Sequence, residues 1–188
     1  WFFEKMDASD YAAIQKRARN FRDLFTVAYV VILFLSPEII RIMADKRYWI
    51  GLSIVPYIFM AYYLNLMYSF EVNVEFYAKK THLIPIGTIL SAAVNVILNI
   101  IFIPRYGYVA AAITTVISNF FLFFFHFLVA NYLIRIFGMR FHLVSLAYVI
   151  ASTTAFIFLQ NYLLARVGIL ILGTLYLYRK YKVVFKEK

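Results

Sequence analysis

The sequence of 188 residues has no cysteine, six glycines, four prolines, and nine acidic residues against nineteen lysines and arginines. The absence of cysteine excludes disulfide bonds and thiolate metal sites. The sequence also shows no glycine-rich phosphate loop, no nucleophile suitably spaced from a base, and no His, Asp and Glu cluster with metal-ligand spacing. We therefore expect no enzyme activity, no metal site and no bound cofactor.

Apolar residues dominate the composition. The chain is 64% hydrophobic and 20% aromatic, with a mean hydropathy of +0.79. Soluble domains contain only about 45–50% apolar residues, so this composition predicts a membrane protein. The basic residues stand at the ends of apolar runs instead of forming one stripe. We expect them to anchor the protein at the membrane surface, with membrane lipids and not nucleic acid as partners.

Long apolar runs define the expected architecture, because a helix needs about 20 apolar residues to cross the hydrocarbon core. The pattern predicts an all-α polytopic membrane protein, with residues 1–188 forming one transmembrane bundle. The second, third and fourth runs carry no charged residue. Six helices are expected, at about 24–44, 49–70, 83–104, 107–134, 143–159 and 163–178.

The segment before the first run has a different pattern. Over residues 1–23 and slightly beyond, apolar residues recur at intervals of three and four from Tyr11 to Phe25, with basic residues elsewhere on the helical wheel. Ser9 or Asp10 can cap its start. We expect an amphipathic lead-in helix on the cytoplasmic membrane surface.

Alternate loops differ strongly in basic charge. Fourteen lysines and arginines fall on the side that includes both chain ends, and five fall on the other. Basic residues accumulate on the cytoplasmic side of membranes. The distribution therefore predicts a multi-pass protein of a cytoplasmic membrane, with both ends of the chain in the cytoplasm and the turn at 104–107 on the outer face.

Polar side chains recur on two of the predicted helices. Ser91, Asn95 and Asn99 are four residues apart and share one face of the third helix, and Thr115 and Asn119 share a face of the fourth. One interpretation is hydrogen bonding between helices, which polar groups in lipid require. The other is the lining of a water-filled cavity, which makes these five residues candidates for substrate contact.

Glu38 is unusual because a carboxylate inside an apolar run is costly and tends to mark a pathway or a paired site. Arg41 lies three residues later on the same helix face, and Pro37 should loosen the helix at this point. Glu38 and Arg41 are therefore interpreted either as a plain ion pair near the outer interface or as a gate or coupling pair.

The other titratable residues are not candidates for a site in the sequence. Glu71 and Glu75 follow the second apolar run and are expected, like most of the carboxylates, to flank helices among basic residues. His126 stands alone near the inner end of the fourth helix. A histidine in such a place is more often packed or interfacial than a proton relay, and we expect the same of His126.

The stretch from the third to the fourth helix carries Asn-x-x-x-Asn, an apolar run, Ile-Pro-x-x-Gly, and Gly-x-x-Ala-Ala-x-x-Thr followed by a serine. The residues are Asn95, Asn99, Ile103, Pro104, Gly107, Ala110, Ala111, Thr114 and Ser118. This pattern resembles the C-terminal module of polysaccharide-biosynthesis flippases of the O-antigen type, in the multidrug/oligosaccharidyl-lipid/polysaccharide exporter superfamily. The resemblance covers roughly residues 1–180. Three weaker matches follow the same order: Leu35–Glu38, Lys46–Tyr48 and Tyr77–Thr81.

The resemblance implies one half of a MATE-like fold, whose two pseudo-symmetric halves surround a central cavity. It implies alternating-access transfer of an undecaprenyl-pyrophosphate-linked oligosaccharide across the bacterial or archaeal inner membrane, for O-antigen, capsule or exopolysaccharide synthesis. Polysaccharide polymerase and glycosyltransferases would be further partners, and H⁺ or Na⁺ a candidate coupling ion. Because this half offers almost no basic residue at mid-membrane, groups that bind pyrophosphate would come from an N-terminal half of the same chain.

Two alternatives to a flippase stay open. A drug or cation antiporter of the same superfamily should carry acidic residues deep in the bundle, and Glu38 near the outer end is thin support for one. A structural membrane subunit without transport activity is the other alternative.

Overall fold

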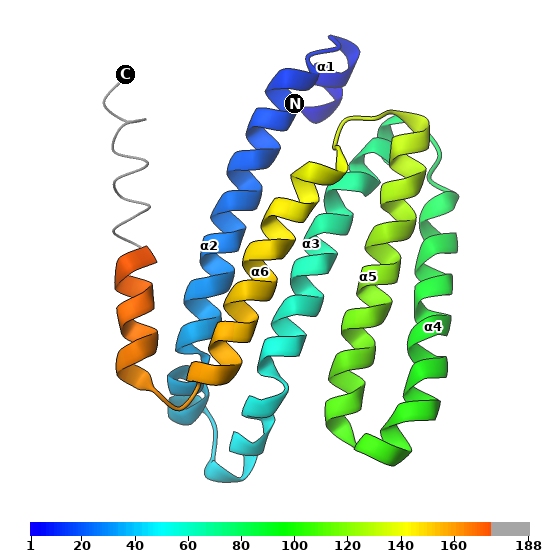
Figure 1. Ribbon diagram of the computed structural model, residues 1–188. Coiled ribbons are helices and arrows are strands. Elements are labelled where there is room, and N and C mark those ends of the chain that lie inside the picture. Colours follow the sequence, from blue (N-terminus) through cyan, green and yellow to red (C-terminus); the bar gives the residue numbers. More distant parts are fainter. Residues whose placement is uncertain (174–188) are drawn as a thin grey trace.

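The computed structural model describes residues 1–173, and every regular element among these residues is helical (Figure 1). A helical segment, Leu163–Gly173, follows the last labelled helix. The labelled elements are α1 (Phe2–Asp7), α2 (Tyr11–Met43), the 3₁₀ helix η1 (Lys46–Ser53), α3 (Val55–Tyr77), α4 (Leu83–Tyr106), α5 (Tyr108–Leu133) and α6 (Met139–Leu159).

Four helices, α2, α4, α5 and α6, are long and apolar enough to cross a membrane. The second predicted span is broken, because η1 and α3 meet at a bend of 57° and only together combine the length and the apolar composition of a span. The described residues therefore contain four or five candidate spans. The sixth predicted helix, 163–178, begins with the segment Leu163–Gly173, and its remainder lies outside the described residues.

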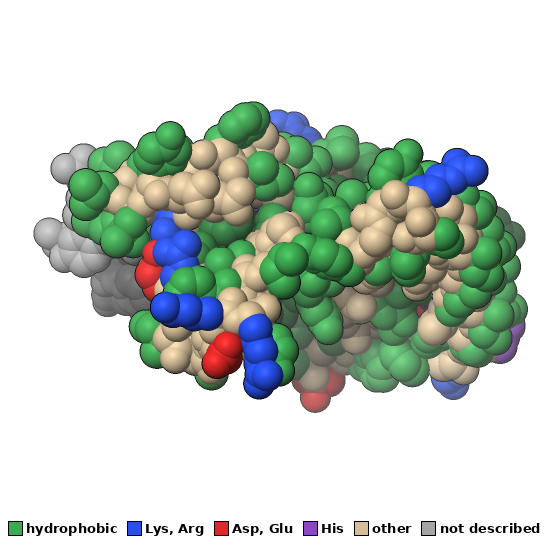
Figure 2. Space-filling model, turned by 90° about the horizontal axis from the view of Figure 1, so that it is seen from below, with side chains coloured by type: hydrophobic (Ala, Val, Ile, Leu, Met, Phe, Trp, Pro, Cys, Tyr) green, Lys and Arg blue, Asp and Glu red, His purple; other side chains and the backbone are tan. Residues whose placement is uncertain are grey.

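The helices run up and down in one bundle in which α3 is central. It packs against α5 and α6, while α4 joins the bundle mainly through α5, and α2 packs on α6 and α3. The N-terminus and the α3–α4 and α5–α6 loops lie together at one end, which we call the basic end (Figure 1). Helix η1 and the α4–α5 turn lie at the opposite end, which we call the turn end. Figure 2 views the turn end and shows a mainly hydrophobic surface with few Lys and Arg side chains.

Helix α2 is one continuous helix of 33 residues, so the amphipathic part of the expected lead-in (1–23), from Tyr11 onward, is not separate from the first span, while Phe2–Asp7 forms the short helix α1. Asp10 caps α2 as predicted, since its Oδ1 accepts a hydrogen bond from the Ala13 N–H at 3.1 Å. The Lys5 ammonium donates to Asp10 Oδ2 at 2.8 Å and, with the Ala13 N–H, holds the pKa of this carboxyl below its usual value. The amphipathic segment and the first span thus form a single rod.

Pro37 lies inside α2 without ending it. A proline has no N–H to donate to the carbonyl four residues earlier, here that of Leu33. The Ser36 hydroxyl donates to Leu33 O at 2.7 Å instead. The next carbonyl, Phe34 O, accepts from Arg166 Nη1 at 2.5 Å. Side chains therefore satisfy the backbone around the proline, and the helix continues.

The predicted hairpin of α4 and α5 is present, but its break falls later than the proline. Pro104 occupies the last turn of α4, and the chain reverses at Gly107, whose φ of +66° is in the region that favours glycine. The Gly107 N–H closes α4 by donating to Ile103 O at 2.8 Å. Glycine, not proline, separates these two helices.

Candidate functional site: buried ionisable pairs among α3, α5 and α6

Glu71 and Glu75 lie inside the bundle, which corrects the expectation that they flank a helix. Helix α3 runs on to Tyr77 instead of ending near Phe70, so both carboxylates belong to its last two turns. They are four residues apart and therefore share one face of α3. Glu71 is 1% exposed and Glu75 is 0% exposed. Carboxylates are almost never this buried unless they are paired.

Each carboxylate faces a histidine from a different helix. His126 of α5 places Nδ1 2.5 Å from Glu75 Oε1, and His142 in the first turn of α6 places Nε2 2.7 Å from Glu71 Oε1. Both imidazoles are fully buried. Three helices thus contribute two Glu–His pairs to one buried layer near the basic end of the bundle.

Aromatic rings enclose this layer. Tyr68 lies edge-on to His126 with ring centroids 4.8 Å apart, and Phe123 and Phe141 lie 4.9 Å from the ring of His142. Helix α4 closes the remaining side through Gly87, because a Cβ there would overlap His126 Nε2 and the ring of Phe125. Apolar walls keep the local dielectric low and strengthen the interaction within each pair.

The chemistry available to the layer is proton exchange. A Glu–His pair holds one proton whether it is an ion pair or a neutral pair, and loss of that proton leaves a buried negative charge, which is costly. Several buried polar atoms have no hydrogen-bond partner within the described part of the chain; His142 Nε2 is close to its carboxylate but not aligned for a hydrogen bond. These atoms are Glu71 Oε1, Glu75 Oε2, His126 Nε2, and Nδ1 and Nε2 of His142.

The layer is not arranged as a metal site. Among residues 1–173 no three His, Asp or Glu side chains converge as metal ligands would. The two histidines belong to separate pairs, each with its own carboxylate. Each histidine therefore faces a single carboxylate.

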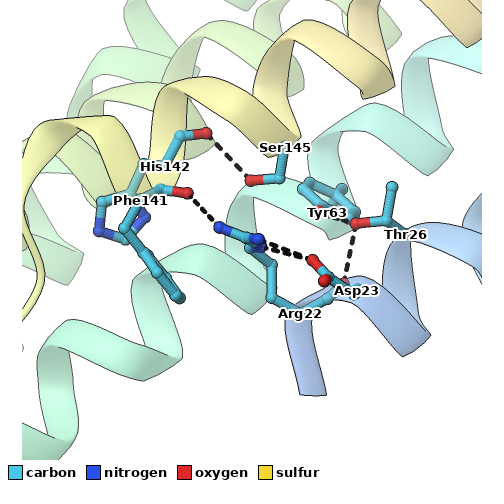
Figure 3. A network of polar contacts seen from close by, with 7 residues as sticks. All are labelled: Arg22, Asp23, Thr26, Tyr63, Phe141, His142 and Ser145. Atoms are coloured by element: carbon cyan, nitrogen blue, oxygen red, sulfur yellow. Dashed lines mark hydrogen bonds and ion pairs between the residues drawn. The ribbon is translucent and has the colours of Figure 1, made fainter. Parts of the chain in front are cut away.

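A second polar network adjoins this layer and joins α2 to α6 (Figure 3). Arg22, only 7% exposed, donates to the Phe141 carbonyl at 2.7 Å through Nη1 and to Asp23 Oδ1 at 3.0 and 2.7 Å through Nε and Nη2. On the other side of Asp23, the Thr26 hydroxyl lies 2.6 Å from the Tyr63 hydroxyl. The network fixes the start of α6, and with it His142, relative to α2 and α3.

Glu38 is paired, but not with the predicted partner. Arg166, in the segment Leu163–Gly173, holds both oxygens of Glu38 with Nη1–Oε2 at 2.7 Å and Nη2–Oε1 at 2.5 Å. Arg166 is 2% exposed. Arg41 instead lies over the ring of Trp49, 5.7 Å from its centroid. The sequence could not identify Arg166 because it lies 128 residues away from Glu38.

The polar face of α4 turns toward α5. The Ser91 hydroxyl donates to the Ser118 carbonyl at 2.7 Å, and Asn95 Nδ2 donates to Ser118 Oγ at 3.1 Å. Asn99 Nδ2 donates to Asn95 Oδ1 at 3.0 Å, and its Oδ1 accepts from Thr114 Oγ1 at 2.5 Å. These contacts form what we call the neutral ladder, and they match the interhelical interpretation of Ser91, Asn95 and Asn99.

The two α5 candidates lie outside this ladder. The Thr115 hydroxyl donates to Ala111 O of its own helix at 2.7 Å. Asn119 is half-buried, and its amide has no hydrogen-bond partner within residues 1–173. The α5 residues that contact the α4 amides are instead Thr114 and Ser118. Of the five polar candidates, Asn119 alone keeps its side-chain hydrogen-bonding groups free in the described chain.

Sequence reasoning missed the two Glu–His pairs, although a signal was present. Ending the second span at its first charge removed Glu71 and Glu75 from consideration, yet these residues have the spacing of one helix face. The two buried histidines follow later in the chain, on α5 and α6. Two acids and two histidines near the same predicted end of the bundle are sufficient to suggest a shared site.

No family model, no curated protein and no solved structure matches the chain.

Proposed function

We propose that this chain is one half of a membrane transporter that passes a lipid-linked oligosaccharide across a cytoplasmic membrane by alternating access. The observation that supports transport over a purely structural role is the pair of fully buried Glu–His contacts among α3, α5 and α6. Ionisable groups inside a membrane bundle are costly and usually serve a pathway or a coupling step. The class of cargo, an undecaprenyl-pyrophosphate-linked glycan, comes from the resemblance around Asn95–Ser118.

The neutral ladder gives the hairpin of α4 and α5 a structural role in this proposal. Its amides and hydroxyls bond one helix to the other, so the two helices move as a unit. Asn119 is the candidate for contact with sugar hydroxyls, because its amide is half-buried and free to donate and accept. An amide suits a passing glycan since it binds hydroxyls without a strong charge.

A drug or cation antiporter of the same superfamily is the second candidate, and the Glu–His pairs favour it. The sequence argument against an antiporter was that acidic residues deep in the bundle were lacking. Glu71 and Glu75, at 1% and 0% exposure, are such residues. Proton coupling through these pairs is compatible with either cargo, so the cargo distinguishes the two proposals.

The test uses the full-length protein in proteoliposomes with an imposed pH gradient. We expect translocation of an undecaprenyl-pyrophosphate-linked oligosaccharide, reduced several-fold by Asn119→Leu. Asn73→Leu is the matched control, because Asn73 is exposed on α3 and donates only to Ser69 O of its own helix. Export of an organic cation without movement of the lipid-linked glycan would replace the flippase proposal with the antiporter. Transport of neither would contradict both.

A further inference from the structure

A pocket of about 350 Å³ lies at the basic end of the bundle, between α2 and the start of α6. Helix α2 supplies one wall, and the α5–α6 connection with the first turns of α6 supplies the other. The lining residues are Gln15, Arg19, Arg22, Ile136, Phe137, Gly138, Arg140, Phe141 and Val144.

The lining residues carry three positive charges, and only one of them has a carboxylate partner in the described chain. Arg19, Arg22 and Arg140 face the pocket, and none of its nine lining residues is acidic. Arg22 is partly neutralised by Asp23. Arg19 and Arg140 are exposed and have no ion pair or hydrogen bond to any described residue. Two guanidinium groups are therefore free to bind an anion.

Two hydrogen bonds between distant parts of the chain hold the walls in place. Gln15 Nε2 donates to the Ile136 carbonyl at 2.7 Å, and Arg22 Nη1 donates to the Phe141 carbonyl at 2.7 Å. The Arg22 guanidinium also lies 4.7 Å from the centroid of the Phe141 ring. A binding site whose walls are already fixed loses less conformational entropy when its ligand arrives.

Apart from Gln15, the remaining lining has no polar side chain and leads to an apolar surface. Ile136 and Phe137 are buried in the floor, and Val144 is 44% exposed next to Leu143, which is 54% exposed. Guanidinium groups bind phosphate oxygens through paired N–H donors. A pocket with arginines at the rim and an apolar path along α6 fits an amphiphile that has an anionic head and a hydrocarbon chain.

We propose that this pocket binds the phosphate head group of an anionic membrane lipid. Basic pockets between membrane helices at the basic side of a protein are suited to such head groups. Two sources share this chemistry: a glycerophospholipid of the bulk membrane and an isoprenoid pyrophosphate carrier. Binding of a glycerophospholipid is independent of the proposed function, whereas binding of the isoprenoid carrier rests on it.

The experiment measures lipid binding to the full-length protein in detergent by native mass spectrometry. The ligands are phosphatidylglycerol and undecaprenyl pyrophosphate, with phosphatidylcholine, undecaprenol and inorganic pyrophosphate as comparisons. The pocket variant is Arg19→Gln with Arg140→Gln, both at exposed side chains. The matched control, Lys16→Gln with Arg135→Gln, removes the same charge from exposed residues that do not line the pocket.

We expect the pocket variant to bind at least one anionic lipid about tenfold more weakly, because each arginine donates charged hydrogen bonds to phosphate. The control variant should change binding less than about threefold, because its two charges lie outside the pocket and salt screens their attraction for the lipid. Weaker binding of both lipids indicates a general site for anionic lipids, and weaker binding of the isoprenoid alone indicates a carrier site.

Three results would overturn the inference. The first is equal lipid binding by the pocket variant and the control variant. The second is no preference for charge, with phosphatidylglycerol bound as weakly as phosphatidylcholine and undecaprenyl pyrophosphate as weakly as undecaprenol. The third is inorganic pyrophosphate binding as tightly as the lipids. Failure of glycan translocation with lipid binding intact would instead contradict the proposed function and leave the pocket assignment standing.

Discussion

Two buried polar regions of the same bundle differ in how completely they are satisfied. In the neutral ladder between α4 and α5, Asn95 and Asn99 each hydrogen-bond another side chain, and neither contributes an unpartnered buried atom. In the Glu–His layer, Glu71 Oε1 and Glu75 Oε2 are buried without a hydrogen-bond partner in the described chain. The amides of the neutral region are all hydrogen-bonded, whereas the ionisable region keeps buried polar atoms without hydrogen bonds in the described chain.

This difference separates two reasons for placing polar groups in a membrane. A satisfied network of amides and hydroxyls contributes modest stability and fixes how two helices pack. A buried pair of titratable groups gains less, because desolvation offsets the attraction, so its retention is better explained by a role in coupling. The contrast predicts that substitutions in the two regions differ in size and in kind.

The largest effect is expected where one partner of a buried pair is removed. His126→Leu leaves Glu75 buried without its partner, which should lower the free energy of unfolding by about 3–5 kcal/mol. Adding Glu75→Leu removes the stranded carboxylate and should restore most of the loss. Denaturation of the purified protein in mixed micelles measures both variants. A double variant as unstable as the single one would show that the pair does not interact as described.

A smaller effect is expected where α4 meets the layer. Gly87→Ala places a methyl group against His126 Nε2 and Phe125, and such overpacking costs about 1–3 kcal/mol. Gly51→Ala is the control, since a Cβ there has nothing within 4 Å. The measurement is the thermal unfolding midpoint, which should be lower for Gly87→Ala than for Gly51→Ala. Equal midpoints would mean that α4 does not approach the layer closely.

The smallest effect is expected in the neutral ladder. Asn95→Leu removes two hydrogen bonds, one to Ser118 of α5 and one to Asn99 of the same helix. Hydrogen bonds between membrane helices are worth about 0.6 kcal/mol on average. Asn73→Leu serves again as the matched control. The same micelle denaturation should show a loss of about 1 kcal/mol for Asn95→Leu and no loss for the control. A loss as large as that of His126→Leu would remove the distinction between the two regions.

Local signals in the sequence were sufficient for the helical character of the described residues and for one helix cap. Hydropathy predicted helices throughout, Asp10 was one of two predicted caps, and the turn after Pro104 was expected, although Gly107 makes it. The predicted count of six spans was not confirmed, since the described residues contain four or five. Hydropathy did not reveal the broken second span, because residues 49–70 are one uncharged, largely apolar run. Pro56, in the first turn of α3, was the local signal for a new helix start.

Partners across the bundle were beyond sequence reasoning. Glu38 had a plausible neighbour in Arg41, but the structure pairs it with Arg166, and only the packing of Leu163–Gly173 against α2 brings these two together. His142 and Glu71 are likewise joined by the packing of α6 on α3. A single sequence shows which groups need partners, while the choice among candidates is made by tertiary contacts.

The unbroken helix α2 also has a mechanical consequence. Its 33 residues extend about 50 Å at 1.5 Å per residue, while the hydrocarbon core is about 30 Å thick. The helix is therefore longer than a span needs, and its first turns pack on the start of α6 and the connection before it through Gln15 and Arg22. A tilt of about 10° around Pro37 would displace Tyr11, about 40 Å away along the helix, by roughly 7 Å. A small change of angle next to the Arg166 contact would in this way become a large displacement at the basic end of the bundle.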